Sequence, residues 1–210
     1  DTSLLHHLIG SRSLVWNLAK NDIKKKFAGS YFGVVWAFVQ PVITVLLYWF
    51  VFEKGLNSKA TDLRTGIEIP FVLWLTAGLV PWFYFQEALN GGTGVLVEYS
   101  YLVKKVVFQI DMLPVVKMIS ALFTHLFFVA FTIVLFICMG YMPDWYALQV
   151  VYYSFCMILF ATGLVYATSA VTVFFRDMKE VVGILLQIGM WVTPIMWNFE
   201  TMVQIPGWAI

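Results

Sequence analysis

Five apolar runs, each long enough to cross a bilayer as a helix, constrain the fold of this chain more than any other feature of its sequence. They cover residues 33–52, 71–89, 118–140, 147–175 and 181–197. A hydrocarbon core of roughly 30 Å requires about 20 apolar residues in a helix. Only 12% of the residues are charged, against about 25% in a soluble domain. The sequence therefore predicts an all-α protein, a polytopic transmembrane helical bundle in which residues 1–210 form a single transmembrane domain.

The basic residues predict the orientation of the bundle. With the amino terminus in the cytoplasm, ten lysines and arginines fall on the inner side and three on the outer side. Cytoplasmic loops carry such an excess of positive charge. We therefore expect a multi-pass protein of the plasma membrane with a cytoplasmic amino terminus. The net charge of only +1 gives no reason to expect a nucleic-acid partner.

Five spans would leave the carboxyl terminus outside the cell. We therefore expect that the sequence is a portion of a longer protein, and that a sixth span, which would return the chain to the cytoplasm, is missing from it. Residues 199–210 are too short to span, and Pro206 and Gly207 interrupt them. This punctuation predicts the start of a short hairpin at the outer surface.

Residues 12–28 have the pattern of an amphipathic helix rather than of a span. Apolar residues recur at spacings of about four, and the segment carries Lys20, Lys24, Lys25 and Lys26. A basic amphipathic helix lies in the headgroup layer, where anionic lipid attracts its lysines. We expect an interfacial helix here. The alternative is a lysine run that only sets the topology.

A polar segment, residues 90–113, separates the second and third runs. It opens with a glycine cluster, which we expect to end the second helix because glycine loses the most backbone entropy on ordering. The segment then regains a helical pattern and presents Glu98, Tyr101, Lys104 and Lys105. We expect it to be a cytoplasmic segment that contacts another chain, and the alternative is a loop that only sets the topology.

Three smaller features carry their own expectations. Residues 109–114 indicate an extended link into the third run. His125 is expected to be a hydrogen-bonded packing residue, because no second ionisable group lies near it in that run to form a relay. The turn after the fourth run holds Arg176, Asp177 and Glu180. The spacing of Asp177 and Glu180 fits a capping pair at a helix amino terminus.

Motifs for catalysis and for energy conversion are missing from the sequence. It has no cluster of His, Asp, Glu or Cys at useful spacing, no GxxxxGK[ST] phosphate loop and no intramembrane charge relay. We therefore do not expect an enzyme or a cofactor held by this chain. Any energy for its work must come from another chain.

Aromatic residues are abundant, with nine Trp, ten Tyr and nineteen Phe. Many lie at the ends of the apolar runs, where anchoring at the membrane interface is the simplest explanation. A weaker hypothesis assigns some of them to a translocation path, because aromatic faces combined with amides suit sugar rings. The candidates for this path are Trp36, Gln40, Tyr48, Gln187 and Trp191.

Several stretches together resemble one family, the membrane subunits of ATP-binding-cassette exporters for cell-surface polysaccharides and teichoic acids. The resemblance rests on residues 21–41, from NDIKKKF through SYFG to QP; on residues 102–108, LVKKVVF, with the later Pro114; and on residues 175–195, from FRD to TPI. It covers nearly the whole chain. Overall, the sequence looks most like the teichoic acid export permeases of the TarG type.

The resemblance implies a homodimer of this subunit with two copies of a separate ATPase, which would bind ATP and Mg²⁺. It implies ATP-driven movement of a lipid-linked polymer from the inner to the outer leaflet, between the two subunits. It also identifies residues 12–28 as the family's interfacial helix and residues 90–113 as its ATPase-coupling segment. Residues 199–210 would begin the outer gate helices that precede a sixth span.

Two other classes of function remain as alternatives. A channel or secondary carrier would show intramembrane charge or inverted repeats of broken helices. Apart from Glu87 near the edge of the second run, the apolar runs show no such charge. A membrane-bound glycosyl- or acyltransferase would need a catalytic constellation at a membrane face. Turnover by the purified chain alone would favour a transferase, and co-purification of an ATPase would favour the exporter.

Overall fold

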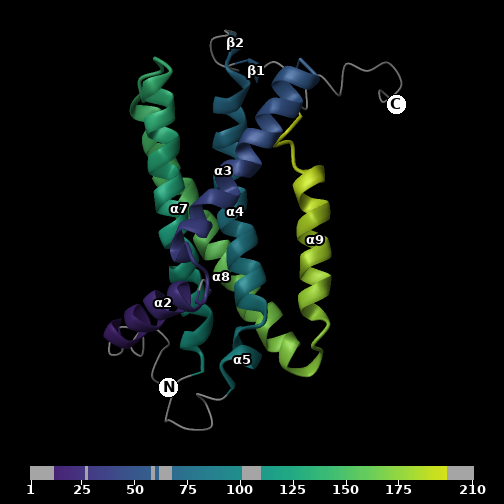
Figure 1. The fold of residues 1–210 in the computed structure, drawn as a ribbon. Helices are drawn as coiled ribbons and strands as arrows, with labels where there is room; N and C mark the ends of the chain where they lie inside the picture. The colour runs from purple at the N-terminus through teal and green to yellow at the C-terminus, as the bar shows by residue number, and fades with distance from the viewer. Residues whose placement is uncertain (1–11, 27, 58–59, 62–67, 101–109, 198–210) are drawn as a thin grey trace, which may run out of the picture.

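The computed structural model describes residues 12–26, 28–57, 60–61, 68–100 and 110–197. These residues are almost entirely helical, and the long helices stand side by side as a bundle (Figure 1). This architecture confirms the predicted all-α helical bundle. In chain order the helices are α2 (Arg12–Lys26), η1 (Gly33–Val35), α3 (Trp36–Trp49), η2 (Phe50–Gly55), α4 (Phe71–Thr93), α5 (Val95–Glu98), α7 (Met112–Cys138), η3 (Trp145–Leu148), α8 (Gln149–Phe174) and α9 (Met178–Val192).

The segments outside the long helices lie at the two ends of the bundle. Two short strands, β1 (Ala60–Thr61) and β2 (Glu68–Ile69), pair antiparallel at one end. The opposite end holds α2, α5 and the turn between α8 and α9 (Figure 1). The sequence predicted these three segments on one side of the membrane, and the fold brings them together.

Helix α4 forms the centre of the bundle. It packs against α3, α7, α8 and α9. Its fully buried side chains include Leu73, Leu75, Leu79, Tyr84 and Ala88, which do not share a single stripe. A helix that is apolar on all sides is a buried helix, and the neighbours of α4 account for this pattern.

Helix α4 ends within the glycine cluster, as the sequence predicts, but at the last glycine of the cluster and not at its start. The helix continues through the cluster to Thr93 and stops at Gly94. Gly92 faces α8 so closely that a Cβ atom there would lie 2.4 Å from Cγ1 of Val165. Beside this contact, the Thr93 hydroxyl donates a hydrogen bond of 3.0 Å to the hydroxyl of Thr168. Because Gly92 has no side chain, α4 and α8 can pack closely, as helices do at small residues in membrane bundles.

Helix α7 begins at Met112, earlier than the predicted third span. Residues 112–114 are therefore helical and do not form the expected extended link. Pro114 lies in the first turn, where its missing N–H would have no partner within the helix. Met112 packs against α2, and Leu113 packs against α5. These tertiary contacts favour the early start, which the local sequence does not indicate.

Arg176 and Asp177 lie in the exposed turn before α9, and Glu180 is exposed in the first turn of that helix. The predicted capping pair is wrong, because Asp177 occupies the N-cap position without any side-chain capping bond. Its backbone is helical, with φ −69° and ψ −6°, whereas a capping residue is normally extended. Backbone bonds close the turn instead, and the Met178 N–H donates to the Phe175 carbonyl at 3.2 Å.

Three helical stretches among the described residues are long and apolar enough to cross a membrane: Gly33–Gly55, Met112–Cys138 and Trp145–Phe174. They correspond to the predicted first, third and fourth spans. Helix α4 has 23 residues and α9 has 15, and both run alongside these three (Figure 1). Their crossing of the membrane stays a prediction, and the expected outer hairpin, residues 199–210, lies outside the described residues.

The contact at Gly92 predicts the effect of one added methyl group. We expect Gly92→Ala to lower the stability of the protein by about 1–3 kcal/mol, as overpacking does, because the new Cβ would overlap Val165. Thermal unfolding of the detergent-purified protein measures the loss. Gly163→Ala in α8 is the matched control, since nothing lies within 4 Å of its Cβ position. Equal melting temperatures for the two variants would contradict the close packing.

Candidate functional site

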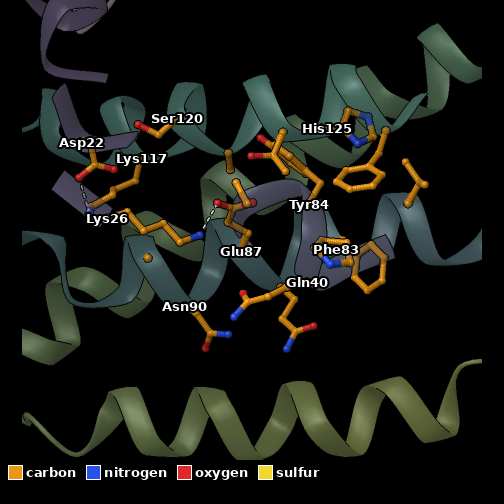
Figure 2. A pocket seen from close by; sticks show the side chains of 18 of the residues that line it. Asp22, Lys26, Gln40, Phe83, Tyr84, Glu87, Asn90, Lys117, Ser120 and His125 are labelled. Carbon is orange, nitrogen blue, oxygen red and sulfur yellow. Dashed lines mark hydrogen bonds and ion pairs between the residues drawn. The ribbon is translucent and has the colours of Figure 1, made fainter. Parts of the chain in front are cut away.

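A cavity of about 710 Å³ opens between α2, α3, α4 and α7, with Glu98 of α5 at its margin. Its size lies within the range of small-molecule sites. Charged side chains gather at one end of the wall with Asn90 beside them, and His125, Tyr84 and Phe83 lie at the other end (Figure 2). The cavity thus lies beside the end of the bundle where α2 and α5 meet.

Asp22 is the central acceptor at the charged end. It accepts a hydrogen bond from the Tyr99 hydroxyl at 2.7 Å and one from Lys117 Nζ, also at 2.7 Å. The side chains of Asp22 and Lys117 are each only 12% exposed. Asp22 follows the buried residues Val15 and Ala19 at helical spacing, so the face of α2 that packs on α7 also carries this carboxylate.

Lys117 extends the network to α5. Its Nζ lies 3.2 Å from Oε2 of Glu98, at the end of that short helix. The Tyr99 ring lies between two ammonium groups, with Lys25 Nζ 5.3 Å and Lys117 Nζ 5.4 Å from the ring centroid, within the range of cation–π contacts. The network therefore joins α2, α5 and α7.

A second ion pair joins α2 to α4. Lys26 Nζ lies 2.7 Å from Oε1 of Glu87, and these side chains are 53% and 26% exposed. The dashed line in Figure 2 marks this pair beside the cavity. From the sequence, the cost of a charge in the second span indicates that Glu87 reaches the headgroups. The fold adds a specific partner, which a single-helix argument does not provide.

The wall also carries uncharged polar side chains. Gln40 comes from α3, Gln86 and Asn90 come from α4, and all three are exposed along the cavity wall. His125 is buried, and its Nε2 lies 3.1 Å from the Ser154 hydroxyl. This contact confirms that His125 is a hydrogen-bonded packing residue.

The predicted interfacial lysines occupy an observed helix. Lys20, Lys24, Lys25 and Lys26 lie on α2 and are exposed, and Lys20 lies over the Trp16 ring at 5.2 Å. The apolar face is narrower than the sequence pattern predicts, because Leu14 is 44% exposed. Helix α2 therefore uses its buried face for α7 and leaves its lysines outside the core.

The predicted ATPase contacts are described only in part. Glu98 is exposed at the end of α5 and pairs with Lys117. Tyr101, Lys104 and Lys105 lie outside the described residues. Their contact with another chain stays a prediction.

The candidate path residues do not gather at one place. Gln40 lines the cavity, and Trp36 is 37% exposed at the start of α3. Tyr48 packs into the apolar cluster around Val45 and Phe71. Gln187 and Trp191 are exposed on α9. A shared path through these residues stays a prediction.

Sequence analysis overlooked the roles of Asp22, Tyr99 and Lys117. Asp22 carried one usable signal, since a carboxylate on the same face as Val15 and Ala19 requires a cationic or hydrogen-bonding partner when it is buried. Nothing in the sequence identifies that partner as Lys117, 95 residues away. Lys117 contributed only to the count of basic residues.

Comparison with known proteins decides the family. Residues 13–210 match the family described as ABC-2 type transporter. The chain belongs to the ABC-2 type transporter family. It is 25% identical over 198 residues to the O-antigen export system permease protein RfbA of Myxococcus xanthus, covering 94% of this chain and 73% of the relative. A protein of the same name from Klebsiella pneumoniae is 22% identical over 197 residues, covering 92% of this chain and 72% of the relative.

The family match supports the two broad predictions about the class of the protein. This ABC-2 family member is an integral membrane permease and not an enzyme, and ATP hydrolysis belongs to a separate ATP-binding-cassette subunit. The resemblance to a polysaccharide export permease is thereby confirmed at the level of the family. The match includes the segment with α2, α5 and the start of α7, so the ion-pair network lies within the family domain.

The Asp22–Lys117 pair predicts a coupled loss of stability. We expect Asp22→Asn and Lys117→Met each to cost about 1–3 kcal/mol, because each removes the opposite charge that lies 2.7 Å from a poorly exposed side chain. The double variant should lose less than the sum. Unfolding of the purified protein measures all three losses. The exposed pair, through Lys26→Met and Glu87→Gln, is the control and should change stability by less than about 1 kcal/mol. Strictly additive losses at Asp22 and Lys117 would contradict the pair.

Proposed function

We propose that this ABC-2 family member is the membrane subunit of an ATP-driven exporter that moves a lipid-linked cell-surface polysaccharide from the inner to the outer leaflet. The observation that carries this proposal is the match to two O-antigen export permeases over more than 90% of the chain. Teichoic acid is the second candidate cargo, supported by the overall similarity of the sequence to teichoic acid export permeases.

The working unit is a homodimer with two copies of an ATPase subunit, which holds ATP and Mg²⁺. The family supports the pairing with such a subunit, and the absence of a phosphate loop from this sequence agrees with it. The end of the bundle that carries α2, α5 and the turn before α9 faces the cytoplasm of a cell bounded by the plasma membrane. The excess of basic residues supports this orientation.

The ion-pair network connects the expected ATPase-coupling segment to the helices of the bundle. Force applied to residues 90–113 reaches Glu98, whose carboxylate lies 3.2 Å from Lys117 Nζ. Lys117 belongs to α7 and also pairs with Asp22 of α2. A displacement of α5 therefore acts on Lys117 through the half-exposed Glu98 carboxylate. Helices α2 and α7 follow together, because the poorly exposed Asp22–Lys117 pair is costly to separate.

Reconstitution tests the proposed activity. The permease, co-purified with its ATPase, is placed in proteoliposomes that contain the lipid-linked glycan. We expect ATP hydrolysis to make the glycan accessible to a lectin on the opposite leaflet. Transport driven by an ion gradient without ATP would favour a secondary carrier instead. Turnover of a sugar donor by the isolated permease would favour a transferase.

Charge reversal in the coupling segment tests the contact with the ATPase. We expect Lys104→Glu combined with Lys105→Glu to reduce ATP-driven export in the assembled complex without unfolding the permease, because the two cations are candidate contacts for the ATPase. The control is Lys54→Glu with Lys59→Glu, which makes the same charge change in the segment expected outside. Unchanged ATP hydrolysis and export in the first variant would remove both lysines from the interface.

The aromatic path predicts a defect in transport without a defect in assembly. We expect Trp36→Ala and Trp191→Ala each to slow export by roughly two- to tenfold, the equivalent of one aromatic contact. Trp145→Ala is the matched control, because Trp145 is 87% exposed in η3 and is not a path candidate. Normal export rates in both path variants would leave interfacial anchoring as the role of these tryptophans.

A further inference from the structure

Three carboxamides in the wall of the cavity have no described function. Among the residues that the structure describes, the side chains of Gln40, Gln86 and Asn90 make no hydrogen bond or ion pair. Gln86 and Asn90 stand one turn apart on α4 and share a face. Figure 2 shows Gln40 and Asn90 extending to the same side of α4. Two helices thus present three amides to one space.

Unpaired amides are costly where Gln40 and Gln86 stand. Both lie within predicted membrane spans, where water is scarce and polar side chains need partners. Pro41, which also lines the cavity, has no N–H and so removes the donor that would otherwise reach the Ala37 carbonyl. The wall therefore offers amide donors and acceptors together with a backbone acceptor, a combination that suits a ligand rich in hydroxyl groups.

The charged side chains of the cavity do not favour an anion. Lys26 is paired with Glu87, and Lys117 is paired with both Asp22 and Glu98. Three carboxylates and three lysines, including Lys25, line the space, so the wall as a whole carries no net charge. A phosphate or an anionic headgroup would have to displace a carboxylate from its lysine. The wall is thus suited to an uncharged polar ligand.

Aromatic rings complete the set of contacts. Phe83 of α4 is half-buried in the cavity wall, and its ring packs against the buried ring of Phe128 of α7, with ring centroids 6.4 Å apart. The C–H faces of a pyranose pack against aromatic faces, while its hydroxyl groups hydrogen-bond to amides. The cavity, at about 710 Å³, has room for such a unit.

We propose that this cavity within one subunit binds a neutral pyranose unit of the exported glycan, and that Gln40, Gln86 and Asn90 bind its hydroxyl groups. The statement that the bound pyranose comes from the exported glycan rests on the proposed function. The binding chemistry itself rests on the unpaired amides, the neutral wall and the two phenylalanines. All of the residues that line the cavity come from one chain.

Ligand-observed saturation-transfer NMR tests the proposal. The full-length permease is placed in detergent-free nanodiscs of phosphatidylethanolamine and phosphatidylglycerol. The ligands are the methyl glycosides of glucose, galactose, mannose, rhamnose and N-acetylglucosamine, with inorganic phosphate and glycerol 3-phosphate for comparison. We expect saturable transfer to at least one methyl glycoside, and no competition from either phosphate. Competition by a phosphate, or a signal from no glycoside, would overturn the proposal and leave a cavity that holds water.

Amide variants assign the binding to this cavity. Gln86→Leu and Asn90→Leu should each weaken glycoside binding by roughly five- to tenfold, the equivalent of a lost hydrogen bond. Gln149→Leu is the matched control, because Gln149 is an exposed amide at the start of α8, outside the cavity. If a leucine variant no longer elutes as a single monodisperse peak, the corresponding methionine variant, Gln86→Met or Asn90→Met, is used in its place. Full binding by the Gln86/Asn90 double variant would place the ligand elsewhere.

The export assay separates this inference from the proposed function. Normal ATP-driven export by the Gln86/Asn90 double variant, together with absent glycoside binding by the wild type, would refute the sugar site and leave the exporter intact. Glycoside binding that depends on Gln86 and Asn90, in a complex that moves no glycan with ATP, would refute the exporter and leave the sugar site intact.

Discussion

The ion pair between Asp22 and Lys117 holds the amino-terminal helix against the rest of the bundle. The apolar contact of α2 with α7 buries Val15 and Ala19 on the α2 side, and the half-buried Leu18 packs against them. The pair adds a directional bond of 2.7 Å between side chains that are 12% exposed. Because breaking such a pair leaves a charge without compensation, α2 is tied to α7 in one register. Through Tyr99 and Glu98, α5 shares that register.

The cavity depends on the same interaction. Helix α2 supplies one of its walls, so the contacts that hold α2 also keep the space open between α3, α4 and α7. The charges at this end neutralise one another, which lets the cavity extend toward the amides of α3 and α4 without a net field. A wall of this kind fits the family's work of moving a polar cargo past a membrane, and it does so within one subunit.

Prediction from the sequence succeeded where each helix could be judged alone. The apolar runs located α3, α4, α7, α8 and α9, and the basic amphipathic pattern located α2. It failed where a second helix decided the outcome. The glycines after Leu89 predicted a helix stop, which comes only at Gly94, while Gly92 lies inside α4 at the point where α8 approaches it. Asp177 looked like a cap, but backbone bonds close its turn.

By itself, the sequence determined the class of the protein, because the length of the apolar runs and the distribution of charge are properties of single segments. It also carried the family, through motifs that keep their order along the chain. Only the tertiary structure decided which charges meet, since Lys26 and Glu87 are 61 residues apart and Asp22 and Lys117 are 95 apart. A hydrophobic period identifies the buried face of its own helix. It contains no information about which helix covers that face, and so the network and the cavity could not be predicted.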